Sequence, residues 1–260
     1  MKYDGRLAGT AALVTCGGGG IGGGIGGATA TALAAAGAAV TVVARRADRP
    51  GAVAGAITAA GGRALAVTCD VTDPEQAGYA VARAIGAFGR LDTVVNNAGR
   101  TLVAGFMSTP VDAWDRTIDL NLRGLLHTSR AALPHLRVAA SSGPRRVADL
   151  VNVAPVTART ATPRGEATAL TAYGVVGLTE ALRQELAGSH VRVCVVGPGT
   201  VDVGGPARGP AGAGAAAVTP LPGCGPVRPE DVADAIAYVV TRRRDVTLGE
   251  IAVRPTARVG

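Results

Sequence analysis

The chain has 260 residues, 48% of them hydrophobic, and a formal net charge of +7. This length and apolar content suffice for a large core, and we expect one domain over residues 1–260. The basic residues are scattered and only 3% of the chain is aromatic, which argues against a base-stacking surface for nucleic acid. Outside the glycine-rich segment near residue 20, no apolar stretch reaches the roughly 18 residues of a membrane span.

The four cysteines are widely spaced and form no C-x-x-C pair. The first ten residues contain no apolar run of the kind found in signal peptides. These features favour a reduced, cytoplasmic protein that holds no metal.

Short apolar runs without polar alternation predict buried strands. They are Ala11–Thr15, Ala39–Ala44, Ala64–Thr68, Thr93–Val95, Val147–Val153, Val191–Val196 and Glu250–Val253. Longer segments between them are patterned as helices, two of them with proline and acids in the first turn. These helices are Ala28–Ala36, Pro74–Phe88, Val111–Leu136, Ala169–Ala187 and Pro229–Thr241. The alternation predicts an α/β fold with a doubly wound parallel sheet of about seven strands and helices on both faces.

Residues 203–227 do not fit this alternation, because glycine, proline and alanine dominate them. Only one helix and one strand follow this segment, so it is too near the end of the pattern to be a linker. We expect a mobile loop that shapes a substrate pocket.

The turn after the first strand carries the clearest chemical signal. Cys16 is followed by a glycine-rich run over residues 17–27 that leads into a helix. Glycines let backbone amides approach a pyrophosphate, and a helix N-terminus favours its negative charge. At the end of the second strand, Arg45 and Arg46 stand where an acid would bind a ribose 2′-hydroxyl. They favour NADP(H) over NAD, and the alternative is that both arginines are merely solvated.

Further motifs follow the later strands. They are Asn96-Asn97-Ala98-Gly99, Asp70 after the third strand, Pro198-Gly199 after the sixth, and Asn121 within Ile118–Leu122. With the glycine turn they resemble the short-chain dehydrogenase/reductase family nearly from end to end. The resemblance implies a Rossmann-type fold, cofactor contacts from Asp70, Asn97, Ala98, Gly99, Pro198 and Gly199, and a catalytic-tetrad role for Asn121. The runs Pro229–Ala233 and Ile251–Thr256 look most like NADP-dependent members that act on small hydroxy acids, and like reductases of clavulanic-acid type.

The glycine turn departs from the TGxxxGxG pattern of that family, and two registers compete. Counting from the strand places Cys16 on the first glycine and Gly20 and Gly22 on the others. Counting back from the helix selects Gly20, Gly24 and Gly26, with a turn four residues longer than usual. We favour the second register, because packing fixes the helix length whereas a glycine loop can absorb an insertion.

The resemblance also exposes missing chemistry. In the family a tyrosine transfers the proton, a lysine four residues later lowers its pKa, and a serine thirteen residues earlier orients the substrate. Aligning Val151–Val153 and Gly177–Leu182 places Pro155, Thr168 and Ala172 at these positions, and the only lysine of the chain is Lys2. Tyr173 lies about 100° from position 172 around the helix, so packing is its ordinary interpretation.

Three functions remain open. The first is a divergent oxidoreductase that binds NADP(H), reduces a small-molecule substrate without a tyrosine, and tailors a specialised metabolite. The second is a non-catalytic subunit that forms a homo-oligomer, or a hetero-oligomer with an active relative, through helices 111–136 and 169–187. These helices build the tetramer core in the family. The third is a non-redox cyclisation or dehydration in the same cleft. Arg159, Arg164 and Glu166 are weaker candidates for unconventional catalysis.

Overall fold

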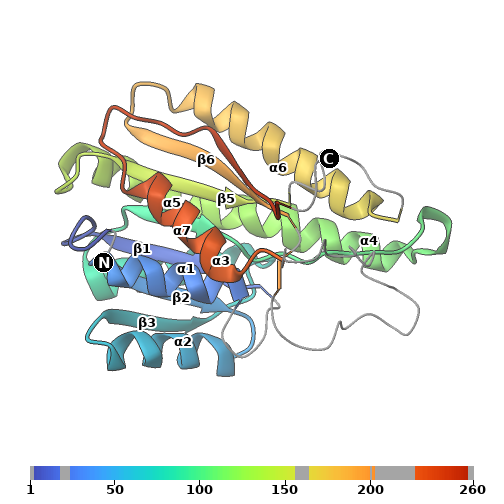
Figure 1. Cartoon of the computed structure of the whole chain (residues 1–260), viewed down its shortest axis with the longest axis horizontal. Coiled ribbons are helices and arrows are strands. Elements are labelled where there is room, and N and C mark those ends of the chain that lie inside the picture. The colour runs from blue at the N-terminus through green and yellow to red at the C-terminus, as the bar shows by residue number, and fades with distance from the viewer. Residues whose placement is uncertain (1–2, 18–23, 156–163, 200, 203–225, 257–260) are drawn as a thin grey trace.

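The computed structural model describes residues 3–17, 24–155, 164–199, 201–202 and 226–256 (Figure 1). Within these residues, seven parallel strands form one sheet in the order β3-β2-β1-β4-β5-β6-β7. Their bounds are β1 Ala11–Thr15, β2 Ala39–Ala44, β3 Arg63–Thr68, β4 Thr93–Asn96, β5 Ala148–Val153, β6 Val191–Pro198 and β7 Glu250–Val253. The predicted doubly wound parallel sheet is thus confirmed.

Helices cover both faces of this sheet. Their bounds are α1 Gly24–Ala35, α2 Asp48–Ala59, α3 Pro74–Phe88, α4 Val111–Ile118, α5 Gly124–Ser142, α6 Glu166–Glu185 and α7 Pro229–Val240, with a 3₁₀ turn η1 Phe106–Ser108 and a π-helical turn η2 Asp119–Arg123. The helices α1, α2 and α7 share one apolar layer, whereas α3, α5 and α6 pack on the opposite face. Figure 1 shows α1 and α7 side by side in front of the strands.

The central strands are mostly apolar because helices cover both of their faces. In β1, Ala12 and Val14 enter the layer under α1 and α7, whereas Leu13 enters the layer under α3 and α5. Successive side chains of a strand point to opposite faces, so a strand between two helical layers needs apolar residues at every position. The same division holds in β4, where Val95 and Val94 enter opposite layers.

Local signals explain why α3 begins and ends where the sequence predicts. The Asp73 carboxylate accepts hydrogen bonds from the N–H groups of Glu75 and Gln76 at 2.9 and 3.3 Å, and Pro74 occupies the first helical position. The carboxylate pairs two N–H donors that a helix N-terminus otherwise leaves unpaired, and proline has no N–H that would need a partner. At the other end, Gly89 adopts a left-handed conformation with φ of 75° and closes the helix.

Several element predictions need correction. The single helix predicted over 111–136 is divided by η2 into α4 and α5, and α5 continues past Pro134 to Ser142. The predicted helices also omit α2, whose Gly51 and Gly55 weaken its local helix signal. Burial of Val53 and Ile57 against β2 and β3 stabilises α2 instead. The first helix begins at Gly24, four residues earlier than the predicted start at Ala28.

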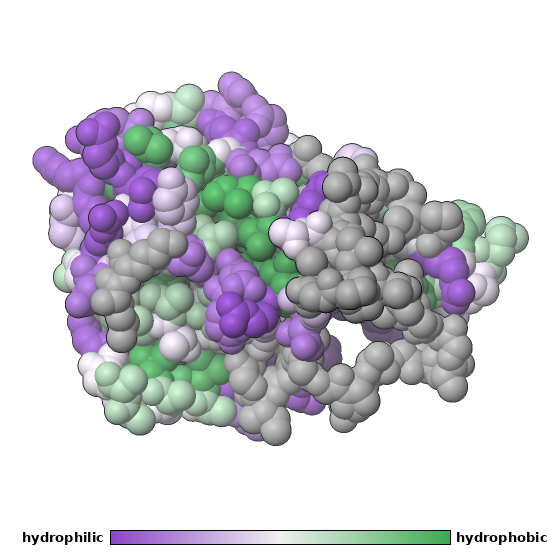
Figure 2. All heavy atoms as spheres, in the orientation of Figure 1, coloured by the Kyte–Doolittle hydropathy of each residue, from purple (hydrophilic) through white to green (hydrophobic). Residues whose placement is uncertain are grey.

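The amino ends of the strands carry a buried ionic cluster. Asp149 of β5 is 1% exposed and accepts two hydrogen bonds from the guanidinium of Arg192 on β6, at 2.7 and 3.0 Å. Arg192 also donates to the carbonyls of Arg243 and Val246, in the loop that follows α7. In Figure 2, hydrophilic surface gathers at the left of the view, on the side of this edge.

The segment predicted as a mobile loop, 203–227, lies outside the described residues except at its end. Just before and at the end of this segment, Val201 and Val227 form an isolated parallel bridge, and the Asp202 N–H donates to the Val227 carbonyl at 2.9 Å. No helix among the described residues is long and apolar enough to span a bilayer.

Candidate active site

The carboxyl ends of β1 and β4 lie side by side, and the chain leaves them toward opposite faces of the sheet. Thr15, the last residue of β1, joins the two ends. Its hydroxyl accepts hydrogen bonds from the N–H groups of Asn97 and Ala98 at 3.0 and 2.9 Å, and the Asn97 side-chain amide donates to the Thr15 carbonyl at 3.0 Å. In doubly wound sheets, the crevice at such a switch point is where ligands bind.

Two glycines allow close backbone packing at this crevice. A Cβ on Gly17 would lie 3.1 Å from the Gly99 carbonyl oxygen. A Cβ on Gly26, in α1, would lie 2.6 Å from the Asn97 side-chain nitrogen and 2.8 Å from Cys16 Sγ. Gly24 opens α1 with φ of 53°, and the predicted Gly20 lies outside the described residues. The sequence interpretation missed Gly17, whose contact with Gly99 depends on the pairing of β1 with β4.

Cys16 lies between the glycine turn and the sheet. Its backbone N–H donates to the Val43 carbonyl at 2.7 Å, and its side chain is buried against Gly26. Burial raises the pKa of the Cys16 thiol to about 12. The thiol is therefore neutral near pH 7, and it packs against the helix as a small apolar group.

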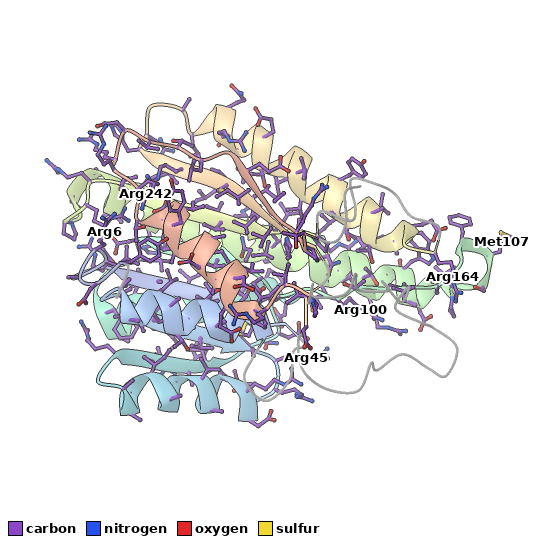
Figure 3. All side chains as sticks on the ribbon, in the orientation of Figure 1. Arg6, Arg45, Arg100, Met107, Arg164 and Arg242 are labelled. Atoms are coloured by element: carbon purple, nitrogen blue, oxygen red, sulfur yellow. The ribbon has the colours of Figure 1, made fainter. Side chains whose placement is uncertain are left out.

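Arginines stand at the end of β2, beside the same crevice. Arg45 is 79% exposed, with Nη1 3.8 Å from Asp70 Oδ2, and Arg46 pairs at 3.8 Å with Asp48 (Figure 3). Arg49, at the start of α2, donates from Nη1 to the Gly17 carbonyl at 3.3 Å. Sequence reasoning missed Arg49, because the signal for α2 was too weak to place it beside the glycine turn.

Asp70 and the predicted Pro198 and Gly199 also follow strand ends. Asp70 Oδ1 accepts hydrogen bonds from the Thr72 N–H and hydroxyl, at 3.0 and 2.8 Å. Pro198 ends β6, and the Gly199 N–H donates to the Val253 carbonyl of β7 at 2.8 Å. A Cβ on Gly199 would lie 3.2 Å from the Pro255 ring, so this glycine also permits close packing.

Asn121 lies in the π-helical turn η2 and holds the segment that follows β4. Its Oδ1 accepts a hydrogen bond from the Arg100 N–H at 2.9 Å, and its Nδ2 donates to the Arg100 carbonyl at 3.0 Å. The same Nδ2 donates to the Thr171 hydroxyl of α6 at 3.0 Å. Single π-helical turns inside α-helices are frequent at functional sites, and this one aims the Asn121 amide at the end of β4.

The predicted triad positions lie just after β5 and within α6. The Thr168 hydroxyl is buried, accepts a hydrogen bond from the Leu102 N–H at 3.0 Å and donates to the Leu102 carbonyl at 3.2 Å. Ala172, one turn later in α6, is 4% exposed and packs with Leu125 and Val195. Pro155 is half-buried after β5. None of these three side chains titrates near neutral pH.

Of the weaker candidates, Arg164 and Glu166 lie just before and at the start of α6. Arg164 has φ of 69°, and its N–H donates to Glu166 Oε1 at 3.2 Å. Tyr173 is 52% exposed on α6, and Arg159 lies outside the described residues. Within the described ranges, no three His, Cys, Asp or Glu side chains gather as a metal ion would require.

Comparison with known proteins agrees with this geometry. The family profile described as short chain dehydrogenase matches residues 10–208. An uncharacterized oxidoreductase of Staphylococcus aureus is 34% identical over 189 residues, which are 73% of this chain and 75% of the relative. A relative from Staphylococcus epidermidis, also an uncharacterized oxidoreductase, is 31% identical over 74% of this chain and 76% of its own.

Solved structures extend the similarity to nearly the whole chain. A short chain dehydrogenase from Burkholderia cenocepacia in complex with NADP has a TM-score of 0.80 and 32% identity, and covers 96% of this chain and 98% of its own. A 3-ketoacyl-(acyl-carrier-protein) reductase from Brucella melitensis complexed with NADH has a TM-score of 0.80 and 27% identity over 95% and 97% of the chains. With its seven-stranded parallel sheet and its match to the family profile over most of its length, the chain belongs to the short-chain dehydrogenase/reductase family.

Proposed function

We propose that this protein binds NADP(H) at the β1/β4 crevice and works as an oxidoreductase on a small-molecule substrate. The observation that carries the proposal is the close packing of Gly17 and Gly26 against Gly99 and Asn97, where an added Cβ would lie within 3.1 Å of its neighbours. Such packing leaves backbone, rather than side chains, at the helix N-terminus where a pyrophosphate binds. When bound, the nicotinamide supplies or accepts the hydride.

The preference for the 2′-phosphate form rests on Arg45 and Arg46. Both guanidinium groups are more than half exposed, and their contacts with acids are long at 3.8 Å. Exposed pairs of this kind are weak, so a phosphate with two negative charges competes well for them. Two similar structures are complexes with NADP, which supports this choice, whereas a third is a complex with NADH and supports only a nicotinamide cofactor.

We further propose that the proton does not come from a tyrosine–lysine pair. Thr168 carries an aliphatic hydroxyl that is already bonded twice to Leu102, and Ala172 offers no cation. In the reducing direction the hydride would go to the carbonyl carbon and the proton to its oxygen, from water or from an acidic group of the substrate. A positioned acid contributes roughly 10²- to 10⁴-fold to rate, so we expect slow turnover restricted to electrophilic carbonyls.

Titration of the purified protein with NADPH and NADH, followed by nicotinamide fluorescence, tests the cofactor assignment. We expect the Arg45→Gln/Arg46→Gln variant to bind NADPH about 10- to 100-fold more weakly with little change for NADH, since each charge-assisted hydrogen bond is strong. Arg83→Gln, on the exposed surface of α3, is the matched control. Absence of binding at millimolar NADPH would contradict the proposal. Deuteride transfer from labelled NADPH to reactive carbonyls, followed by mass spectrometry, then tests catalysis.

A non-catalytic subunit is the second candidate, and the buried Thr168–Leu102 pair favours it. With its hydroxyl bonded in both directions, Thr168 has no donor left for a substrate oxygen. In this case α5 and α6 would form an interface, either with a second copy or with an active relative. Co-expression with an active relative and mass measurement of the purified complex tests this candidate. Deuteride transfer by the protein alone would count against it.

The cysteines and the surface arginines bear on the cellular compartment and on the binding partners. Among the described residues, Cys16, Cys69 and Cys194 are free and buried, which supports a reducing, cytoplasmic environment. We propose no nucleic-acid partner and no membrane attachment, because the exposed arginines are dispersed over the surface.

A further inference from the structure

Within the described residues, the segment 100–104 that follows β4 is hydrogen-bonded along only one edge. Asn121 bonds both the N–H and the carbonyl of Arg100, and Thr168 bonds both the N–H and the carbonyl of Leu102. At the next alternate residue, the Ala104 N–H donates to the Arg164 carbonyl at 2.9 Å. Two side chains and one carbonyl thus form the hydrogen bonds that a neighbouring strand would form with this segment in a sheet.

The alternation shows that the segment is extended. In a strand, the N–H and carbonyl of one residue point to the same side, and those of the next residue point to the opposite side. The backbone groups of Thr101 and Val103 therefore point away from Asn121 and Thr168. In the described part of the chain these four groups have no hydrogen-bond partner. Thr101 is exposed and Val103 is half-buried, so a free strand edge is open to a ligand.

This free edge begins beside the crevice. Gly99, immediately before the segment, packs against Gly17 and lies next to Asn121. Asn121 and Thr168 belong to η2 and α6, which both lie on one face of the sheet, so the free edge faces away from these helices. Figure 1 shows the chain leaving β4 at the carboxyl ends of the strands and running out toward α4.

A cation stands at the start of the edge. The Arg100 side chain is half-buried, and no acid forms an ion pair with it in the residues that the structure describes. Figure 3 places Arg100 at the same end of the sheet as Arg45. A half-buried guanidinium without an acid partner is stabilised by a ligand carboxylate, which it can bind with two hydrogen bonds.

We propose that Arg100 and the Thr101–Val103 edge bind an N-acylamino acid or a short peptide acid. The ligand amides would add to the edge as an extra strand, and its carboxylate would pair with Arg100. Amide groups on one side of an extended chain repeat about every 6.6 to 6.8 Å, and the same repeat is expected between Thr101 and Val103 in an extended segment. That this ligand is the substrate rests on the proposed function, whereas the binding itself does not require the cofactor.

The probe is N-acetyl-Ala-Ala as the free acid, added to ¹⁵N-labelled protein without cofactor. We expect the amide resonances of Thr101 and Val103 to shift more than those of Arg100 and Leu102, whose N–H groups are bonded internally. The methyl ester of the probe should bind about 10-fold more weakly, because it cannot form a charge-assisted pair with Arg100. No shift at about 10 mM probe would overturn the proposal, since that corresponds to less than about 3 kcal/mol of binding free energy.

Two pairs of variants measure separately how the free strand edge and the Arg100 cation contribute to binding. Val103→Pro removes an outward N–H, is compatible with an extended Leu102, and should weaken binding of the acid about 3- to 10-fold. Val103→Ala keeps that N–H and should bind normally. Arg100→Gln should weaken binding of the acid about 10-fold while Asn121 still holds its backbone, and Arg123→Gln on η2 should not. Equal binding by Val103→Pro and Val103→Ala, or by Arg100→Gln and Arg123→Gln, would overturn the proposal.

NADPH titration of the same variants keeps this proposal distinct from the proposed function. Shifts at Thr101 and Val103 without NADPH binding would support the ligand edge and contradict the cofactor. NADPH binding without those shifts would do the reverse. An unchanged thermal unfolding midpoint in Val103→Pro confirms that its effect on binding is not a folding defect.

Discussion

At the glycine turn, the distances around single atoms decide which side chains are tolerated. Gly26 shows this most clearly, because the space beside its Cα is filled by Cys16 and Asn97. Gly78, on α3, has no atom within 4 Å of the corresponding point. Gly26 is therefore required by packing, whereas Gly78 has room for a side chain and only lowers the stability of its helix.

Replacing Gly26 by alanine tests this contrast. The new Cβ would lie 2.6 Å from the Asn97 side-chain nitrogen and 2.8 Å from Cys16 Sγ. We expect Gly26→Ala to lose about 1–3 kcal/mol of unfolding free energy by overpacking, and to weaken NADPH binding. Gly78→Ala should instead gain about 0.5–1 kcal/mol, because alanine is the better helix former. Urea denaturation measures both changes in unfolding free energy. An unchanged unfolding free energy in Gly26→Ala would show that Cys16 and Asn97 can shift to make room for the new Cβ.

Cys16 leads to a prediction about pH. Burial raises the pKa of its thiol from 9.0 to about 12, so folding favours the neutral form. The resulting stabilisation is complete below the unfolded pKa and is lost as pH rises from 9 toward 12. At pH 8 only about one thiol in 10⁴ is ionised in the folded protein. Iodoacetamide should therefore modify Cys16 at least about 100-fold faster in urea than in buffer, as measured by peptide mass spectrometry. Comparable rates would show that the thiol is accessible.

Short motifs predicted where part of the candidate site lies, and contacts between residues far apart in sequence completed it. Asn97, Gly99 and Asn121 could be predicted, because short motifs fix them beside strand ends and a helix. The partners of Asn121 could not, since Arg100 and Thr171 reach it only after η2 has turned its amide toward both β4 and α6. Contacts between residues far apart in sequence carry no local signal.

At the scale of elements, the predicted bounds are accurate where caps mark them. The limits of α3 match the prediction at both ends, because Asp73, Pro74 and Gly89 each supply a terminal signal. For α2 the local signal fails, since Ala47 at its N-cap makes no side-chain hydrogen bond and two glycines lie inside it. That helix depends on tertiary burial, which the sequence pattern alone did not reveal.

A buried ion pair between Asp149 and Arg192 joins β5 to β6, and an Arg192 variant tests how much it contributes to stability. Arg192→Met would leave the Asp149 carboxylate buried, with only the longer 3.5 Å contact from Arg145. We expect a loss of about 3 kcal/mol of unfolding free energy in urea denaturation. Arg116→Met, which removes an exposed pair with Asp112, should change stability by less than about 1 kcal/mol.

A double variant distinguishes the lost pair from lost packing. Asp149→Leu/Arg192→Met removes both charges, and we expect it to recover much of the stability lost in the single variant. If the double variant is no more stable than Arg192→Met, then the bonds from Arg192 to the Arg243 and Val246 carbonyls matter more than the charge pair.

At the scale of the whole molecule, α5 and α6 present apolar side chains to solvent. Val138 is 63% exposed, and Leu170 and Tyr173 are 51% and 52% exposed. We expect an oligomer in solution, and the Leu170→Glu/Tyr173→Glu variant should reduce the mass measured by light scattering to one half or one quarter. Tyr79→Glu is the matched control, since Tyr79 is also 52% exposed but lies on α3. A wild-type monomer at micromolar concentration would contradict the expected assembly.

The parallel bridge between Val201 and Val227 has a consequence for how such a protein diversifies. The bridge holds the chain before and after residues 203–225 together, at a point between the end of β6 and the start of α7. Doubling the length of a flexible segment between two fixed ends costs only about 0.6 kcal/mol in closure entropy. The match to the family profile also ends within residues 203–225, at residue 208. We therefore expect that evolution, or loop grafting in the laboratory, can replace residues 203–225 with a segment of another length or sequence. The positions of β6, α7 and the switch-point crevice would not change.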